Sequence, residues 1–281
     1  MFEKVSKYHP DKLADRIAGA IVDYAYTQKK NPKVAVEVLI GHGNALIINE
    51  TDTKVPQHVI KEIVERIVDD PLKINYVEVK QDEHLSKNQE NGFRCGDNGI
   101  FKGVPNGQNE YALNMSFITR ELDDRFKSDG KIVNRDGKLI VCQSKAQERD
   151  IADVVKQYTG NYNINPLGYW EGGTNVDSGA TNRKLGSDMG DAITGGGLHG
   201  KDLTKADVSI NLYLNKLANE LDSEVTASCG IGDEVVHIRI GKYGKYLYPT
   251  FTEIVEGARA IVKKIGGFEK LAEYGLIWNA M

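Results

Sequence analysis

The chain has 281 residues, of which 40% are hydrophobic and 27% are charged. This composition supports a folded core, which excludes disordered and collagen-like proteins. Its 36 basic and 40 acidic residues give a net charge of −4, so no overall positive field favours nucleic acid as a partner. The three cysteines are Cys95, Cys142 and Cys229, a spacing that fits neither a disulfide framework nor a zinc ribbon. Without a run of about 18 apolar residues or a signal-peptide core, the sequence favours a cytoplasmic protein with no membrane partner.

The first 80 residues predict a sheet with helices packed on it. Pro10 begins a helical stretch in which apolar residues recur every four positions. Residues 34–40 and 45–48 are apolar runs joined by a Gly-rich turn, which is typical of two strands. A second helix with Val59, Ile63 and Ile67 on one face and a strand over residues 74–79 follow. This order predicts an α+β fold.

The rest of the chain alternates between apolar patterns and Gly-rich loops. Residues 81–107 are polar and predict a loop, and residues 146–158 leave helix and strand equally open. Residues 172–200 are rich in glycine and have little apolar periodicity. The remaining patterns predict helices over 111–126, 210–221 and 254–265 and strands over 138–142, 224–228 and 235–240.

The Gly-rich segment ending at Lys201 has two familiar patterns. Residues 195–200 satisfy G-x-G-x-x-G, and residues 195–201 nearly satisfy a P-loop. Asp202 stands where a P-loop has Ser or Thr, and no apolar strand precedes the segment. A solvated flexible loop is the plain alternative. Bare backbone N–H groups beside Lys201 and Lys205 would nevertheless provide what a polyphosphate needs.

Three further groups of residues carry candidate chemistry. His9 and Asp11 stand where the first helix begins, and a helix N-terminus attracts anions; a simple helix cap is the alternative. Glu37 interrupts an apolar strand, so it either binds a cation or faces water at a sheet edge. Residues 96–99 (Gly-Asp-Asn-Gly) have the composition of a tight turn.

Five motifs follow one another in a fixed order. They are Glu3-x-Val5-Ser6-x-x-His9-Pro10-Asp11-Lys12, Gly96-Asp97-Asn98-Gly99, Lys145-x-Gln147, Asp177-x-Gly179-x-Thr181-x-Arg183-Lys184 and Gly195-Gly196-Gly197-x-x-Gly200-Lys201-Asp202-x-Thr204-Lys205-x-Asp207. Together they resemble the motifs of S-adenosylmethionine synthetase (methionine adenosyltransferase), and the spacing of Glu37 and Glu50 fits this family as well. The chain resembles a compact, shortened member. Asn182 departs from the family pattern, which has Gly before the Arg-Lys pair.

The resemblance implies a fold, an assembly and a reaction. The fold is α+β with three similar sheet-plus-helix subdomains related by pseudo-threefold symmetry, here residues 1–90, a shortened 91–168 and 169–281, intertwined into one unit. The assembly is a homodimer, with a tetramer possible, in which methionine-side and phosphate-side groups of one site come from different subunits. The reaction joins ATP and L-methionine into S-adenosylmethionine and cleaves the tripolyphosphate to pyrophosphate and phosphate, with Mg²⁺ and K⁺ as cofactors.

The resemblance also assigns roles to residues. The catalytic set is His9, Lys145, Arg183 and Lys201. ATP and its phosphates would contact His9, Lys145, Trp170, Arg183, Lys184, Lys201 and Lys205. Methionine would contact Glu50, Gln89, Asp97 and Asp177. Magnesium would bind Asp11 and Asp207, and potassium would bind Glu37. Two alternatives remain open, a P-loop-like kinase or NTPase and a non-catalytic nucleotide-binding relative.

Overall fold

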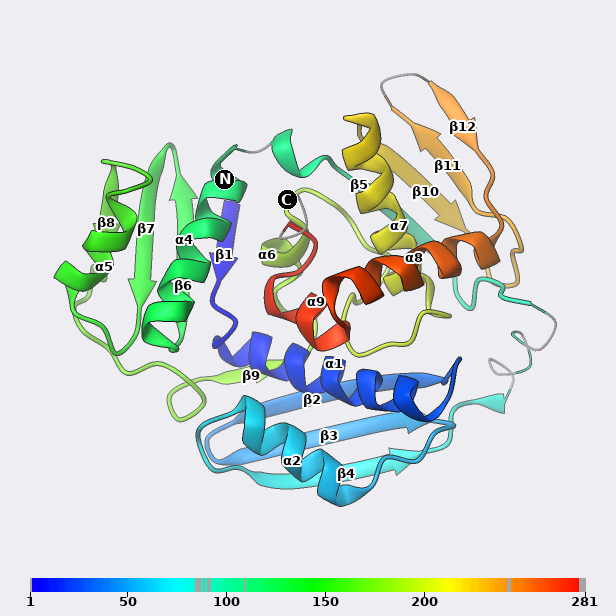
Figure 1. The fold of residues 1–281 in the computed structure, drawn as a ribbon, viewed down its shortest axis with the longest axis horizontal. Helices are drawn as coiled ribbons and strands as arrows, with labels where there is room; N and C mark the ends of the chain where they lie inside the picture. The colour runs from blue at the N-terminus through cyan, green and yellow to red at the C-terminus, as the bar shows by residue number, and fades with distance from the viewer. Residues whose placement is uncertain are drawn as a thin grey trace.

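The structure is a computed structural model that describes residues 2–83, 87, 89, 92–108, 110–241 and 244–277. Within these residues, helices and strands mix in an α+β fold with three four-stranded sheets arranged around a helical centre (Figure 1). The strands are β1 (Phe2–Val5), β2 (Val34–Gly41), β3 (Asn44–Thr51), β4 (Lys73–Val79), β5 (Gly99–Gly103), β6 (Gly130–Arg135), β7 (Lys138–Gln143), β8 (Tyr162–Ile164), β9 (Ser178–Ala180), β10 (Val225–Cys229), β11 (His237–Ile240) and β12 (Lys245–Leu247). The helices are α1 (Pro10–Gln28), α2 (Gln57–Ile67), α4 (Glu110–Phe126), α5 (Glu148–Val155), α6 (Leu185–Met189), α7 (Ala206–Leu221), α8 (Phe251–Ile265) and α9 (Phe268–Tyr274), with a 3-10 turn at Asn106–Gln108.

The first sheet has the strand order β4-β3-β2-β9. β2 and β3 form a hairpin, and β4 returns parallel to β3 after α2. β9, from far along the chain, pairs antiparallel with the end of β2. Alternate residues of β2 are buried beneath the helices, which is the period expected of a strand with one covered face.

The second and third sheets differ in how they end. The second sheet, β1-β6-β7-β8, repeats the plan of the first: a hairpin, a helix (α5), a parallel strand (β8) and an antiparallel edge strand. In the third, β12-β11-β10-β5, all pairs are antiparallel, and β12 pairs with β11, the strand before it in the chain. Two of the three sheets thus share one connectivity, and the pseudo-threefold relation stays a prediction.

Each sheet takes an edge strand from a different part of the chain. β1 joins strands of residues 130–164, β5 joins strands of residues 225–247, and β9 joins strands of residues 34–79. Relative to the expected segments 1–90, 91–168 and 169–281, every segment gives one strand to another in a cycle. The boundaries between these segments stay a prediction.

α1 lies between the first sheet and α9 (Figure 1). Its expected apolar positions Leu13, Ile17 and Ile21 are buried, as are all the residues from Pro10 to Val22, so this part of the helix is covered on every side. Gly19 faces α9 so closely that a Cβ there would lie 2.7 Å from the Phe268 carbonyl oxygen. The helix is therefore buried along most of its length.

The predicted helices and strands are found, the short elements β1, β6, β8, β9, β12, α6 and α9 were not predicted, and two segments differ from what was expected. The loop expected over residues 81–107 is wrong for β5, because this strand has only two apolar residues and forms by pairing with β10. The open segment at 146–158 is helical, since α5 buries Ile151, Val154 and Val155 on one face. Within the described ranges, no helix is both long and apolar enough to cross a membrane.

Candidate functional site

Most of the residues assigned by the motifs gather in two places. We call the first the α1 half-site, made of His9, Asp11, Asp177, Arg183 and Lys184. Asp11 is its centre: its Oδ2 lies 2.7 Å from Lys184 Nζ, and its Oδ1 lies 3.5 Å from Arg183 Nη1. Asp11 is buried, and its Oδ1 also accepts a hydrogen bond from the backbone N–H of Ala180. The Arg183 side chain remains about half exposed and free to reach a ligand.

The charges of the α1 half-site are set by burial and by Lys184. Burial, together with the Lys184 charge, lowers the pKa of His9 to about 4. His9 is therefore neutral at pH 7, with its Nδ1 accepting a hydrogen bond from the Asp11 N–H. Burial alone would raise the pKa of Asp11, but hydrogen bonds from Lys184 and Ala180 hold it below the ordinary value. At neutral pH the Asp11 carboxylate thus lies beside a neutral imidazole, with the Lys184 and Arg183 cations next to it.

A glycine allows β9 to approach the start of α1. A Cβ on Gly179 would lie 2.0 Å from the carbonyl carbon of Pro10, so no other residue fits without moving the helix. This contact brings the Asp177–Lys184 segment against His9 and Asp11.

Lys145 and Trp170 lie next to each other, joined by a 2.9 Å hydrogen bond from the Lys145 N–H to the Trp170 carbonyl.

The second place is a cavity of about 210 Å³, which we call the cavity half-site. It is lined by Lys33, Ala35, Gln81, Gln89, Gly96, Asp97, Lys201, Thr204, Lys205, Ala206 and Asp207. Lys201 Nζ lies 2.6 Å from Asp207 Oδ2, which repeats the Asp–Lys pairing of the α1 half-site. Gln89 bonds through both ends of its amide to the backbone of Arg94.

The cavity contains two residues that the motifs do not indicate. Lys33 follows the loop after α1, and Gln81 follows β4; neither belongs to a recognisable pattern. The Oε1 atom of Gln81 is buried and has no hydrogen-bond partner in the described part of the chain. An unpaired buried acceptor in a polar cavity is a place for a donor group of a ligand. Sequence reasoning had no signal for either residue.

The two half-sites lie at opposite ends of β2. At one end Gly41 pairs with Ser178 of the Asp177–Lys184 segment, and at the other Ala35 bridges to Lys201. Six residues of strand separate these points by roughly 20 Å. Asp97 and Lys201 line one cavity of one chain, so the structure divides the groups differently from the methionine-side and phosphate-side division that the resemblance implies.

Three backbone N–H groups of the Gly-rich segment, which were expected to be bare, are bonded within the protein. Asn182 Oδ1 accepts hydrogen bonds from the N–H groups of Leu198 and His199, and Gly196 N–H donates to Thr194 Oγ1. Asn182, the departure from the family pattern, thus holds the segment through its side chain. Its glycines serve close packing, because a Cβ on Gly196 would lie 2.4 Å from Asp207 Oδ2. No named strand leads directly into the segment, so the P-loop alternative loses its structural context.

The face of the first sheet between the two half-sites is exposed and mostly apolar. The side chains of Leu39, Leu46, Ile48, Val77 and Val79 are each 36–50% exposed there. Glu37 and Glu50, the predicted potassium and methionine residues, lie on the same side of β2 and β3. Glu37 accepts a hydrogen bond from the Thr181 hydroxyl, so one end of this face contacts the Asp177–Lys184 segment.

A buried cluster beside the α1 half-site resembles a metal site but already contains a cation. Ligand atoms of Asp15, Asp188 and His199 lie within 4.8 Å of one another. The Lys12 ammonium lies among them, 2.7 Å from Asp188 and 3.1 Å from Asp15. Burial would lower the pKa of Lys12, but Asp188 and Asp15 raise it above its ordinary value. The ammonium therefore balances these carboxylates, and no metal ion is needed there.

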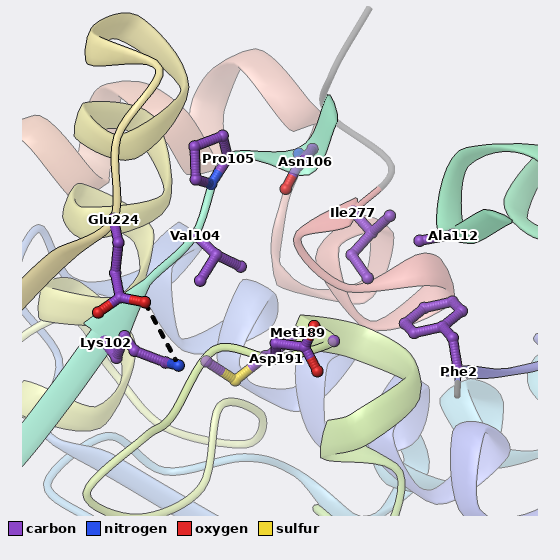
Figure 2. Close-up of a pocket in the computed structure, with 11 residues that line it drawn as sticks. Phe2, Lys102, Val104, Pro105, Asn106, Ala112, Met189, Asp191, Glu224 and Ile277 are labelled. Atoms are coloured by element: carbon purple, nitrogen blue, oxygen red, sulfur yellow. Dashed lines mark ion pairs between the residues drawn. The ribbon is translucent and has the colours of Figure 1, made fainter. Parts of the chain in front are cut away.

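A larger cavity lies elsewhere in the fold and has a different character. Its volume is about 470 Å³, and Figure 2 shows Lys102 and Glu224 at one end and Phe2 and Ile277 at the other. Lys102 and Glu224 pair with each other at 3.6 Å. Val104, Pro105 and Met189 are among the remaining lining residues. Since none of the motif residues lines this cavity, we assign the candidate chemistry to the two half-sites.

Comparison with known proteins supports the resemblance. Residues 1–90 match the N-terminal domain of S-adenosylmethionine synthetase. A protein of Borreliella afzelii named S-adenosylmethionine synthase is 26% identical over 305 aligned positions, which cover 83% of this chain and 78% of that protein. Proteins with the same name from Borrelia garinii subsp. bavariensis and Nitratidesulfovibrio vulgaris are 27% and 24% identical, with the same coverage. The resemblance inferred from the five motifs is thereby confirmed.

Proposed function

Starting from a chain related to S-adenosylmethionine synthetase, we propose that it is a methionine adenosyltransferase. It would join ATP and L-methionine into S-adenosylmethionine and cleave the released tripolyphosphate to pyrophosphate and phosphate. The observation that carries this proposal is the grouping of most of the matched cations and carboxylates into two half-sites at the ends of one strand. With ATP as a substrate, we place the protein in the cytoplasm.

The proposed adenosyl transfer needs cations more than it needs a base. A thioether sulfur has no proton to lose, so it attacks the ribose C5′ carbon directly. The difficult part is the highly charged leaving group, which needs positive charge where negative charge develops. One cation about 4 Å away contributes on the order of 4 kcal/mol at an effective dielectric near 20, before desolvation is subtracted. The neutral His9 would donate or accept a hydrogen bond at the leaving oxygen, and the lysines and Arg183 would hold the phosphates.

The aspartates of the two Asp–Lys pairs are the proposed ligands of magnesium. Asp11 pairs with Lys184, and Asp207 pairs with Lys201, at 2.7 and 2.6 Å. Mg²⁺ binds proteins through one or two carboxylates together with substrate phosphates, so these two acids fit it. Mg²⁺ would neutralise phosphate charge, while Lys184 and Lys201 would turn from their carboxylates to phosphate oxygens. Glu37, with the Thr181 hydroxyl as its neighbour, is the corresponding proposal for K⁺.

Methionine would lie where acceptors remain in the cavity half-site. Asp97 offers a carboxylate and Gln81 an unpaired amide oxygen to the α-ammonium group of methionine. Gln89 would join them after exchanging its bonds to Arg94. From the other half-site and the exposed sheet face, Asp177 and Glu50 complete this pocket. Trp170 would stack on the adenine ring, and Lys145 beside it would reach the phosphates.

A homodimer would bring the two half-sites together. If a twofold axis packs the exposed faces of two first sheets against each other, each end of β2 in one copy can lie opposite the other end of β2 in its partner. The α1 half-site of one copy would then face the cavity half-site of the other, and the apolar side chains between them would be covered. One chain, with its half-sites roughly 20 Å apart along the strand, would be inactive alone.

The reaction is tested by incubating the purified protein with ATP, methionine and Mg²⁺ and measuring the sulfonium product by mass spectrometry and phosphate by colorimetry. We expect methionine-dependent formation of the sulfonium, phosphate and pyrophosphate, and none with excess chelator. Formation of ADP would instead support a kinase. ATP binding without turnover would support the non-catalytic relative.

The shared site is tested by mixing two inactive variants. Lys184→Ala removes a cation of the α1 half-site, and Lys201→Ala removes one of the cavity half-site. Random exchange of subunits makes half of the dimers mixed, each with one intact site of two, so about a quarter of the parent activity should return. The matched control mixes Asp97→Asn with Lys201→Ala, both in the cavity half-site, and should stay inactive. Equal recovery in both mixtures, or none in either after verified exchange, would contradict this arrangement.

A further inference from the structure

Lys33 is the one lysine of the cavity half-site that no motif explains. It lies on the loop before β2, and its backbone N–H is fixed by a 3.0 Å hydrogen bond to Asp52 Oδ1. Its side chain is partly buried and lines the same cavity as Lys201 and Lys205. Lys33 therefore adds a third lysine to this cavity, beside the two that the resemblance assigns to phosphate.

The acids near Lys33 are already occupied by other groups. Asp52 pairs with the Lys29 ammonium at 2.6 Å. Asp202 is fully buried and accepts hydrogen bonds from the backbone of Val34 and from Thr204. The Lys33 Nζ atom lies over the Phe93 ring, 5.7 Å from its centroid. A partly buried ammonium with a ring but no carboxylate against it favours an anionic ligand.

The charges around Lys33 agree with this. Burial is the largest cause of a lowered pKa for Lys33, and the neighbouring Lys205 charge lowers it further, against the opposing effect of Asp202. Lys201 is held by Asp207, but neither Lys33 nor Lys205 has an ion-pair partner recorded in the described part of the chain. Two like charges held near each other in a cavity are relieved by a ligand that carries several negative oxygens.

We propose that Lys33 is a further polyphosphate-binding residue of the cavity half-site, which with Lys201 and Lys205 grips the tripolyphosphate released from ATP. This rests on the proposed function for the identity of the ligand. The cavity geometry favours a polyphosphate over the single carboxylate of methionine, because three ammonium groups share one space of about 210 Å³. Lys33 would thus hold the intermediate between its release and its cleavage.

The test measures binding of inorganic tripolyphosphate and, separately, of methionine to the whole protein by titration calorimetry. Lys33→Gln should weaken tripolyphosphate binding about tenfold, which is about 1.4 kcal/mol, and leave methionine binding within twofold. Lys33→Arg should restore most of the affinity. Lys30→Gln removes the same charge from an exposed neighbour outside the cavity and should have no effect. Circular dichroism and thermal midpoints check that each variant is folded.

The outcomes separate this inference from the proposed function. Tripolyphosphate affinity unchanged in Lys33→Gln would overturn the inference, even in a protein that makes S-adenosylmethionine. Weakened methionine binding with tripolyphosphate binding intact would also overturn it and assign Lys33 to the amino-acid carboxylate. Loss of tripolyphosphate affinity in a protein that makes no S-adenosylmethionine would support the phosphate site and refute the proposed reaction. During turnover, Lys33→Gln should release more free tripolyphosphate relative to pyrophosphate than the parent does.

Discussion

Replacing Lys12 by methionine should destabilise the protein severely. Lys12 is 1% exposed, and its ammonium is the cation between Asp15 and Asp188, which are both 0% exposed. The substitution keeps most of the side-chain volume and removes the charge, so two buried carboxylates lose their compensation. Removing one partner of a buried ion pair costs about 3–5 kcal/mol. Typical domains have a free energy of unfolding of roughly 5–15 kcal/mol, so the variant should still fold but with low stability.

Urea unfolding followed by far-UV circular dichroism measures this loss. At pH 7.5 we expect Lys12→Met to lose about 3–5 kcal/mol, while Lys30→Met, an exposed lysine, stays within about 0.5 kcal/mol of the parent. The double variant Lys12→Met with Asp188→Asn should recover part of the loss, because one of the stranded charges is removed. Without Lys12 the pKa of Asp188 rises, so the variant should gain stability relative to the parent as the pH falls.

Two results would refute the reasoning. A loss below about 1 kcal/mol would show that the ammonium does not compensate these carboxylates, since the buried-pair estimate is several times larger. A large fall in the thermal midpoint of the parent on adding chelator would show that a divalent ion, and not Lys12, holds Asp15, Asp188 and His199 together. We expect chelator to leave the midpoint of the substrate-free protein unchanged.

Three further predictions follow from other contacts. Gly179→Ala would place a Cβ 2.0 Å from the Pro10 carbonyl carbon, so it should lower S-adenosylmethionine formation at least about tenfold, whereas Gly107→Ala, with open space around its Cβ, should not. Asn182→Gly keeps the left-handed backbone (φ 63°) but removes the bonds to Leu198 and His199, so it should speed amide hydrogen exchange over residues 197–200 with little change in the thermal midpoint. Burial raises the pKa of Asp123 to about 6; the penalty for its charge is present above pH 6 and is relieved as the pH falls towards 4. Relative to Asp123→Asn, the unfolding free energy of the parent should therefore rise between pH 7.5 and pH 5, by about 1–1.5 kcal/mol, and a flat difference in urea titrations would contradict this.

The local patterns predicted the longer regular elements but not the short ones or the pairing partners. Repeated apolar positions located α1, β2, β3 and α2, because each element is long and has one buried face. β1 and β5 are short edge strands whose structure depends on pairing with residues more than a hundred positions away. No local pattern encodes such a pairing, so β5 was assigned to a loop and β1 was not predicted.

The sequence also predicted the candidate site only in part: it indicated residues but not their arrangement. The motifs indicated which residues carry the chemistry, since cations and carboxylates for a polyphosphate must occur in the sequence. Their separation into two half-sites depends on the register of β2 against Ser178 and Lys201, which only the fold reveals. Lys33 and Gln81 were missed because a single lysine or glutamine in a loop has no distinctive pattern. The expectation of bare N–H groups near Lys201 was wrong for Leu198 and His199, because Asn182 reaches them from another segment.

The cyclic exchange of edge strands has a consequence for how the chain folds. The first sheet needs residues 178–180, and the sheet that contains β1 needs residues 130–164, so neither can be completed from the first 90 residues. Such non-local pairing slows folding, because distant segments must meet before their contacts stabilise one another. During synthesis the edges of the early strands would remain unpaired until more than half of the chain has emerged. We therefore expect a fragment of residues 1–90 to aggregate through the unpaired edge of β2 and not to form an independent domain.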